Sequence, residues 1–392
     1  MGMSHASAQA SAPFIEKRNL FVAETDGYAL YRIPGIIVTR RGSILAWCEA
    51  RKRAGSDWGT TDIQVRHSTD GGKTFDAPRI IANVEGPKQK NPVALAQNLT
   101  ATDEVAYNNP VMIADHNGVV HFLFCLEYMR CFYARSTDDG KTFSKPVEIT
   151  STFERFRSEY NWKVLATGPG HGLQLKRGRL IVPIWLSEGT GGHAHRPSVN
   201  ATIYSDDHGK TWQRGAIIIP NTSDWVNPSE AVAVELTEGR VMFNSRSESR
   251  PNRRLIAYSQ DGATNWTKPS FHNELIEPVC LASLIRLSEK PSRLLFVNPN
   301  NLSRADGKDT PGMGRDRKNI SVRLSYDEGQ TWPVTKVLEP GPSAYSDLAV
   351  TKDGTILCLY ENGFKDRRNT YSAQLTLARF NLEWLTDGKD KK

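Results

Sequence analysis

Short, mostly apolar runs recur along the chain, separated by turns that contain glycine. They read RIPGIIVTRRGSILAWCEA at 32–50, VVHFLFCLEYMRCFYARS at 119–136, GRLIVPIWLS at 178–187 and GTILCLYENG at 354–363. Runs of this length, rich in Val, Ile, Leu and aromatic residues, are typical of β-strands. Long stretches with helical periodicity are scarce, so the pattern predicts an all-β fold.

One motif recurs between these runs, Ser-x-Asp-x-Gly-x-Thr followed by an aromatic residue. Four full copies begin at Ser68, Ser136, Ser205 and Ser325, and a degraded copy begins at Ser259. Each interval between copies has room for four strands and a loop. Spacing of this kind indicates one four-stranded blade per repeat, and hence a β-propeller. Another all-β solenoid or sandwich is the alternative.

The motif has the chemistry of a hairpin turn. Its aspartate can accept hydrogen bonds from the backbone N–H groups of the turn, and its glycine allows a positive φ. We expect the closing aromatic ring to pack beneath the hairpin. These aspartates, among them Asp70 and Asp207, are therefore expected at the outer rim, in a structural role.

The chain has 392 residues, which is long for an ordinary domain but suits a propeller folded as one unit. We expect residues 1–15 to be disordered, or a remnant of cloning or processing, and residues 16–392 to form a single propeller domain. The N-terminus has no apolar segment, so it is not an intact signal peptide. No apolar run approaches the roughly 18 residues of a membrane span.

The 50 Lys and Arg residues exceed the 43 Asp and Glu residues, giving a formal net charge of +7. Such an excess is either a solvated surface or a means of attracting anionic substrates. No basic stripe with interleaved aromatic residues is present, which argues against nucleic acid. The five cysteines, an odd number without metal-site spacing, are expected to be small core residues: Cys48, Cys125, Cys131, Cys280 and Cys358.

Over roughly residues 20 to 385 the chain resembles the sialidases, also called neuraminidases. The resemblance is carried by the repeats and by an ordered set of motifs: YRIPG at 31–35, EAR…GSDWGTTDI at 49–63, a Glu before a β-hairpin, and AYSDL at 344–348. It implies a six-bladed β-propeller with a site on the central axis. It further implies a secreted or periplasmic retaining exo-α-sialidase that acts on sialylated glycans and needs no cofactor.

The family holds the carboxylate of its substrate with three arginines. Arg32 and Arg246 match the first two, and Arg317 is our choice for the third, with Arg315 and Arg323 as alternatives. Arginine suits this role because its planar guanidinium stays charged and binds a carboxylate through two hydrogen bonds.

The resemblance makes Tyr345 the nucleophile and Glu230 its base. Sialidases with a tyrosine nucleophile are an exception to the usual pair of catalytic carboxylates in glycosidases. An anionic nucleophile would be repelled by the substrate carboxylate, whereas a neutral phenol can approach and lose its proton during attack. We expect the Tyr345 hydroxyl to contact Glu230.

The general acid implied by the resemblance is Asp57, on a glycine-rich loop, and its pKa must rise towards the working pH. Asp62 is a rival in the same segment, which we interpret as a structural residue at the start of a strand. Arg51 resembles a site arginine near the substrate carboxylate. Glu361 resembles the carboxylate that holds Arg32 in place.

Several further residues have weaker claims. His193 and His195 are too few for a metal site, and His171 is either a substrate contact or a turn residue. The segment Asn109–Pro110 and Trp225 are candidates for a pocket that takes an N-acyl group. A carbohydrate-binding propeller without activity, a trans-sialidase and a polysaccharide lyase with a Tyr or His base remain the alternative functions.

Overall fold

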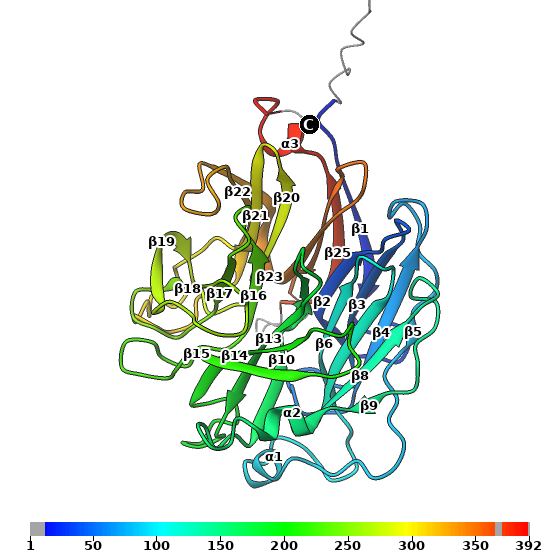
Figure 1. Ribbon diagram of the computed structural model, residues 1–392, viewed down its shortest axis with the longest axis vertical. Coiled ribbons are helices and arrows are strands. Elements are labelled where there is room, and N and C mark those ends of the chain that lie inside the picture. The colour runs from blue at the N-terminus through cyan, green and yellow to red at the C-terminus, as the bar shows by residue number, and fades with distance from the viewer. Residues whose placement is uncertain (1–11, 365–370, 391–392) are drawn as a thin grey trace, which may run out of the picture.

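The computed structural model describes residues 12–364 and 371–390. Within these ranges the chain is almost entirely β-structure, with its strands arranged as a propeller of twisted sheets around a common centre (Figure 1). Three short helices lie outside the sheets, α1 (Pro92–Ala96), α2 (Thr150–Glu154) and α3 (Leu382–Leu385). No helix of the described residues is long and apolar enough to cross a membrane.

The first two sheets follow each other along the chain. The first has the order β2 (Leu30–Val38), β3 (Ile44–Arg51), β4 (Thr61–Ser68) and β5 (Arg79–Ile80). The second has the order β11 (Gly170–His171), β6 (Tyr107–Ala114), β7 (Val120–Leu126), β8 (Arg130–Ser136) and β9 (Val147–Glu148).

The next two sheets repeat this antiparallel plan. The third contains β10 (Val164–Thr167), β13 (Leu180–Ser187), β14 (Ser198–Ser205) and β15 (Gln213–Ile219), with the short β12 (Leu173–Gln174) beside β13. The fourth has the order β16 (Ala231–Glu235), β17 (Val241–Ser245), β18 (Arg253–Ser259) and β19 (Ser270–Ile276).

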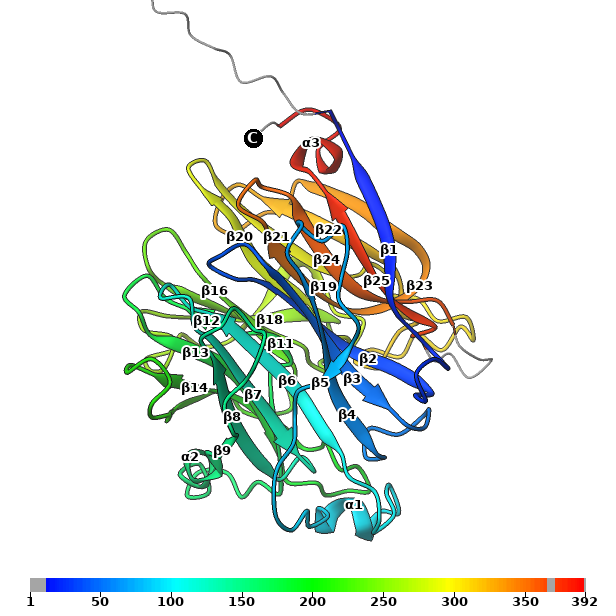
Figure 2. The same ribbon diagram turned by 90° about the vertical axis from the view of Figure 1, so that its right-hand side faces the viewer.

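The last sheet has seven strands and joins the two ends of the chain. Its order is β1 (Ile15–Val22), β25 (Gln374–Phe380), β24 (Ile356–Asn362), β23 (Val334–Val350), β22 (Lys318–Ser325), β21 (Ser292–Pro299) and β20 (Ser283–Glu289). Strand β1 pairs with β25, so the N-terminal strand lies beside the C-terminal one (Figure 2).

The expected all-β propeller is present, but the described strands form five hydrogen-bonded sheets, so six blades are not seen as six separate sheets. The cause is the seventeen-residue β23, which pairs with β22 along its first part and with β24 along its second. Of the N-terminal segment 1–15, residues 1–11 lie outside the described residues, and Ile15 already begins β1. The division into one domain over 16–392 stays a prediction.

The core lies between neighbouring sheets. Strands β3, β7 and β13 are buried at every position, because sheets cover both of their faces, and such strands appear as continuous apolar runs. Trp47 of β3 and Phe122 of β7 belong to one such cluster. All five cysteines are buried and unbridged, as expected of small core residues.

The copies of the repeated motif begin at the last residues of β4, β8, β14, β18 and β22 and form the turns that follow these strands. In the first copy Asp70 accepts hydrogen bonds from the backbone N–H groups of Lys73 and Thr74, both at 2.9 Å, and Ser68 accepts one from Gly72. In the turn of Asp207, its carboxylate likewise accepts hydrogen bonds from the backbone N–H of Thr211 at 2.9 Å and from the Thr211 hydroxyl at 2.6 Å. None of the motif aspartates lines the pocket described below, so their contacts are structural.

These turns should make the stability of the fold depend on pH in the acidic range. Burial alone would raise the pKa of Asp207, but hydrogen bonds from Thr211 and Ser205 outweigh burial and lower this pKa to about 2. Because the pKa in the unfolded chain is about 4, the carboxylate stabilises the fold above pH 4, and this contribution is lost as pH falls towards 2. We expect the melting temperature of Asp207→Asn to fall less steeply over this range.

The control for this experiment is Asp103→Asn, which changes an exposed aspartate outside the motif. It should keep the pH dependence of the parent protein in thermal melts. Equal slopes for the parent and Asp207→Asn between pH 4 and 2 would show that the turn carboxylate contributes nothing to acid stability.

Candidate functional site

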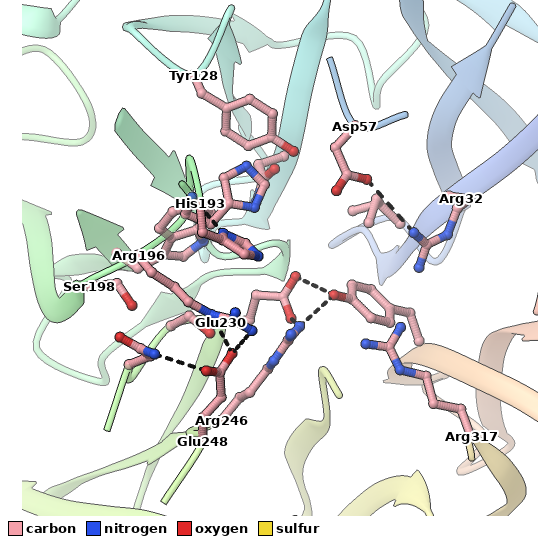
Figure 3. A pocket seen from close by; sticks show the side chains of 17 residues that line it. Arg32, Asp57, Tyr128, His193, Arg196, Ser198, Glu230, Arg246, Glu248 and Arg317 are labelled. Atoms are coloured by element: carbon pink, nitrogen blue, oxygen red, sulfur yellow. Dashed lines mark hydrogen bonds and ion pairs between the residues drawn. The ribbon is translucent and has the colours of Figure 1, made fainter. Parts of the chain in front are cut away.

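A pocket of about 210 Å³ lies among residues from several sheets (Figure 3). The three residues expected to be catalytic and the three arginines expected to bind the carboxylate line it together: Asp57, Glu230, Tyr345, Arg32, Arg246 and Arg317. They come from β2, β23 and the segments that follow β3, precede β16, follow β17 and precede β22. Residues that are far apart in the chain thus meet because each sheet contributes an edge to the same hollow.

The centre of the pocket is the phenol of Tyr345. Its hydroxyl donates a hydrogen bond of 2.5 Å to Glu230 and accepts one of 2.8 Å from Nη1 of Arg246. The same Nη1 also bonds the other oxygen of Glu230 at 2.5 Å. Since 115 residues separate Tyr345 from Glu230, the contact arises from the fold rather than from local sequence.

Burial and a charged neighbour oppose ionisation of this phenol. Burial contributes most to raising the pKa of Tyr345 well above its usual value, and the charge of Glu230 raises it further. The charges of Arg246, Arg317 and Arg32 act in the opposite direction. The phenol is therefore neutral at physiological pH, and it sits beside a carboxylate that can accept its proton.

Three guanidinium groups surround the ring of Tyr345. The Cζ atoms of Arg32 and Arg317 lie 5.0 and 5.1 Å from the ring centroid, and Arg246 contacts the hydroxyl. Arg317 donates to the carbonyl oxygen of Val279 at 2.8 Å, and no carboxylate of the described residues pairs with it. Its charge is thus available to an anion in the pocket.

The other two candidates for the third arginine are used elsewhere. Arg315 donates to carbonyl oxygens of its own loop, including that of Leu302 at 2.8 Å. Arg323 donates to the side chains of Thr335 and Asn300. Of the three, only Arg317 lines the pocket.

A bulge in the pairing of β2 with β3 positions Arg32, between Arg32 and Gly35. There Ile33 has a φ of 57°, which is unusual for a β-branched residue, and its N–H donates to Glu361 at 3.1 Å. A Cβ atom on Gly35 would lie 2.1 Å from the ring of Trp47, so only glycine fits there.

Glu361 also fixes the side chain of Arg32. Its two oxygens accept hydrogen bonds of 2.9 Å from Nε and 3.2 Å from Nη2 of Arg32. This pairing uses one side of the guanidinium and leaves Nη1 towards the pocket. Glu361 therefore lies behind Arg32, where the resemblance implied it.

Asp57 lies beside Arg32 in the pocket wall, with 42% of its side chain exposed. Its carboxylate accepts a hydrogen bond of 2.7 Å from Arg51 and lies 3.8 Å from Arg32. Burial would raise the pKa of Asp57, but the charges of Arg51 and Arg32 outweigh burial and hold this pKa well below its usual range. The carboxyl group is therefore ionised before any substrate arrives.

Two residues near Asp57 in the sequence, Arg51 and Asp62, do not line the pocket. Arg51 is buried behind Asp57, where it pairs with Glu49 at 2.6 Å, and it does not line the pocket. Its expected position near a substrate carboxylate stays a prediction. Asp62 lies on β4 and accepts a hydrogen bond of 2.7 Å from Tyr28, outside the pocket.

An aromatic wall completes one side of the pocket, and sequence reasoning missed most of it. The ring of His195 lies 5.0 Å from Tyr128, 5.1 Å from Trp185 and 5.4 Å from Trp58. Burial contributes most to lowering the pKa of His195, to about 4. This histidine is therefore neutral at physiological pH. In sequence, Tyr128 and Trp185 could not be told from core residues of strand-like runs.

The wall next to His195 is polar. Glu248 accepts a hydrogen bond of 2.9 Å from Arg196, and both residues are labelled in Figure 3. It accepts another of 2.8 Å from Asn227. All three residues line the pocket. Glu248 stands two positions after Arg246 in the sequence, which is the only signal that could have suggested it.

Of the remaining residues singled out in the sequence, some line the pocket and others lie outside it. Asn109 lines the pocket, whereas Pro110 and Trp225 are absent from its lining. His171 does not line it either, and its Nδ1 lies 2.6 Å from Asp347, one of the least exposed carboxylates. His171 therefore lies outside the pocket wall, and of Tyr345 and His171, the two bases considered for a lyase, only Tyr345 lines the pocket.

Comparison with known proteins agrees with the resemblance to the sialidases that the sequence motifs carry. Residues 42–358 match a family model described as a BNR repeat-like domain. A sialidase of Micromonospora viridifaciens is 30% identical, over 98% of this chain and 57% of that protein. A sialidase of Bacteroides fragilis is also 30% identical, over 87% of this chain and 61% of that protein. The chain thus spans less than two thirds of both relatives.

Solved structures share the fold. The Hadza microbial sialidase Hz136 superposes with a TM-score of 0.73 at 25% identity, over 94% of this chain and 69% of that one. The intramolecular trans-sialidase of Ruminococcus gnavus gives a TM-score of 0.72 at 19% identity, over 94% of this chain and 98% of that one. At the latter identity the likeness shows only a common architecture.

Proposed function

We propose that the chain, which belongs to the BNR repeat-like domain family and has sialidases among its relatives, is a retaining exo-α-sialidase. Its substrate would be a glycan that ends in sialic acid, a sugar with a carboxylate on its anomeric carbon. The observation that carries the proposal is the buried phenol of Tyr345, held between one carboxylate and three guanidinium groups.

The arginines would fix the substrate carboxylate above the tyrosine. Arg32 and Arg246 are already oriented by Glu361 and Glu230, so they lose little freedom when an anion arrives. Arg317 would supply the charge that no carboxylate of the described residues neutralises. The anomeric carbon then lies close to the phenolic oxygen.

In the first step the phenolic oxygen of Tyr345 forms a bond to the anomeric carbon as the bond to the leaving oxygen breaks. Glu230 takes the phenolic proton and Asp57 protonates the leaving oxygen. In the second step Asp57 takes a proton from water, the water oxygen attacks the anomeric carbon, and Tyr345 leaves and regains its proton from Glu230. Two displacements on opposite faces return the original configuration.

The low pKa of Asp57 in the free protein needs a change on binding. A substrate carboxylate on the arginines would neutralise part of the charge that now holds the pKa of Asp57 down. The exposed loop position would also let Asp57 exchange Arg51 for the leaving oxygen. Binding of the anionic sugar would thus prepare its own general acid.

The direct test is incubation with an aryl α-sialoside. We expect release of the aryl alcohol, and proton NMR should show the α-anomer of the free sugar first. Initial release of the β-anomer would contradict retention, and the absence of release at any pH would contradict the sialidase proposal.

Removing one arginine should weaken substrate binding. We expect Arg317→Ala to raise the KM for the aryl sialoside about 100-fold, because a charge-assisted pair with the substrate carboxylate is worth a few kcal/mol. Arg317→Lys should recover only part of this loss, since an ammonium lacks the planar pair of donors. The control is Arg323→Lys in β22, the strand that follows Arg317 directly, which should keep the parent KM.

We also propose that the seven-stranded sheet represents two blades that share β23, which would give six blades in all. The change of pairing partner along β23, from β22 to β24, supports this division. Secretion or a periplasmic location remains a prediction from the resemblance.

A further inference from the structure

A buried ion pair lies close to the pocket, and the mechanism above leaves it unused. Nη1 of Arg254, on β18, is 2.5 Å from the carboxylate of Glu277, and neither side chain is exposed. Neither residue lines the pocket. Taking two charges out of water offsets much of their attraction, so a buried ion pair is weak evidence for stability. Stabilisation of the fold alone therefore does not account for this pair.

The pair holds both backbone polar groups of Cys280. The second carboxylate oxygen of Glu277 accepts a hydrogen bond of 2.8 Å from the N–H of Cys280. Nη1 of Arg254 donates one of 3.1 Å to the carbonyl oxygen of the same residue. Arg254 is itself fixed to the neighbouring strand β17, because its Nε donates to the side chain of Asn244 at 2.6 Å. The pair thus attaches the segment 277–280, between β19 and β20, to the strands β17 and β18.

The residue before Cys280 reaches the pocket. The carbonyl oxygen of Val279 accepts a hydrogen bond of 2.8 Å from Nη2 of Arg317, and it is the one acceptor that this guanidinium finds among the described residues. Val279 has a φ of 62°, which a β-branched residue rarely adopts. Such a conformation persists only where the surroundings impose it. The bonds to Cys280 are part of those surroundings.

Two further contacts fix the same segment. The side-chain amide of Asn252 donates to the carbonyl oxygen of Glu277 at 3.0 Å. The backbone N–H of Arg315 donates to the carbonyl oxygen of Pro278 at 3.1 Å. Together with Arg317 and the ion pair, these contacts engage the carbonyl oxygen of every residue in the segment 277–280. The segment is therefore a rigid support, and part of it stays fixed when the pair is removed.

We propose that Arg254 and Glu277 are positioning residues that hold Arg317 in place for the substrate carboxylate, through the backbone of Val279 and Cys280. The inference rests on the proposed function, because it takes Arg317 as a ligand of that carboxylate. A guanidinium that is already held loses little freedom when the anion arrives. Removal of the pair should therefore weaken substrate binding although neither residue touches the substrate.

A carbonyl oxygen is a suitable partner for the third arginine. Arg32 is oriented by a carboxylate, that of Glu361. A carboxylate against Arg317 would neutralise the charge that the substrate needs, whereas a carbonyl oxygen accepts a hydrogen bond and carries no net charge. The charge of Glu277 is balanced by that of Arg254. The pair thus orients Arg317 without competing with the substrate.

The first test removes both charges together, in Arg254→Met with Glu277→Met, so that neither charge stays buried without its partner. We expect the KM for an aryl α-sialoside to rise about 10-fold, because Arg317 is still present but is no longer held at its position. The kcat should stay within about 2-fold of the parent, since the contact of Tyr345 with Glu230 is unchanged. A cooperative thermal melt shows that the variant is folded.

A second variant, Arg254→Lys, keeps the buried charges balanced and so protects the fold. One ammonium replaces the guanidinium nitrogens that contact Asn244, Glu277 and Cys280, and it cannot keep all three contacts. We expect a rise in KM of about 3-fold with kcat unchanged. A parent KM in either variant, with a melting transition that shows it to be folded, overturns the proposal.

The decisive measurement combines Arg254→Met and Glu277→Met with Arg317→Ala. Where the pair acts through Arg317, this combination should have the kcat/KM of Arg317→Ala alone, because the group that the pair holds is already absent. Independent effects would multiply and lower kcat/KM by about another 10-fold. That result would contradict the proposal.

The matched control is Arg286→Met with Glu328→Met. It removes another arginine–glutamate pair of low exposure, with a separation of 2.6 Å, from outside the pocket. It should keep the parent KM, whatever its effect on the melting temperature. A KM that rises as far here as in the variant of Arg254 and Glu277 would mean that any lost ion pair loosens the site, which also overturns the proposal.

Failure of this inference and failure of the proposed function give different results. A parent protein that hydrolyses no sialoside contradicts the proposed function. A parent that hydrolyses the aryl sialoside, with the same KM in the variants of Arg254 and Glu277, contradicts only the positioning role. Calorimetry with the dehydrated sugar makes the same distinction without turnover. The inhibitor should bind the parent, and should bind Arg254→Met with Glu277→Met about 10-fold more weakly; equal binding would overturn the positioning role.

Discussion

Replacing Tyr345 by phenylalanine is expected to lower kcat by about four orders of magnitude, the typical consequence of removing a nucleophile that acts together with its base. The phenolic oxygen is the only atom lost, and the ring can stay between Arg32 and Arg317. Arg246 keeps its bond to Glu230, so the arginine cluster should remain in place. Steady-state kinetics with an aryl α-sialoside measures the effect.

The control for this variant is inhibitor binding. The dehydrated form of the sugar should bind Tyr345→Phe within a few fold of the parent, as measured by calorimetry, because the carboxylate contacts are untouched. Near-parent turnover would rule out Tyr345 as the nucleophile. Loss of both turnover and inhibitor binding would show that the hydroxyl holds the arginines in position, which would also contradict a role limited to attack.

The fold could be predicted as far as local chemistry determines it. The turn motif places its aspartate, serine and glycine within a few residues, so the bonds of Asp70 and Asp207 follow from the sequence alone. The merging of two groups of strands through β23 does not follow. It depends on where the pairing of one strand passes from β22 to β24, which only packing against distant strands decides.

In the site, too, some features could be predicted from local sequence and others depend on distant parts of the chain. Arg32 and Asp57 could be proposed from motifs, because each lies in a distinctive segment. Arg315, Arg317 and Arg323 could not be separated in sequence, since all three stand within nine residues. What separates them is the surroundings, because carbonyl oxygens of a loop occupy Arg315 while Arg317 reaches the pocket.

Residues that shape the walls were the hardest to predict. Trp185 lies in β13, where every neighbour is buried, so its sequence environment is that of any core residue. Its place in the pocket wall comes from contact with His195, which belongs to a loop ten residues away. The low pKa of Asp57 was also unforeseen, because it results from Arg51 and Arg32 converging on one carboxylate.

The second large effect concerns Asp57. If it protonates the leaving oxygen, the cost of losing it depends on how much the leaving group needs a proton. We expect Asp57→Asn to lower kcat/KM about 1,000-fold for methyl α-sialoside, whose alkoxide is a poor leaving group, but less than about 10-fold for an aryl sialoside with an acidic phenol. Asparagine keeps the size of the side chain, so the pocket shape is preserved.

The matched control is Asp62→Asn, which removes a carboxylate from the same segment but outside the pocket. It should lower both rates by less than about 2-fold, as expected of a substitution away from the reacting atoms. The ratio of the two substrates is the decisive quantity, because a distorted pocket would slow both alike. Equal losses on methyl and aryl substrates in Asp57→Asn would therefore assign Asp57 to the electrostatic support of Arg51 and Arg32 rather than to proton transfer.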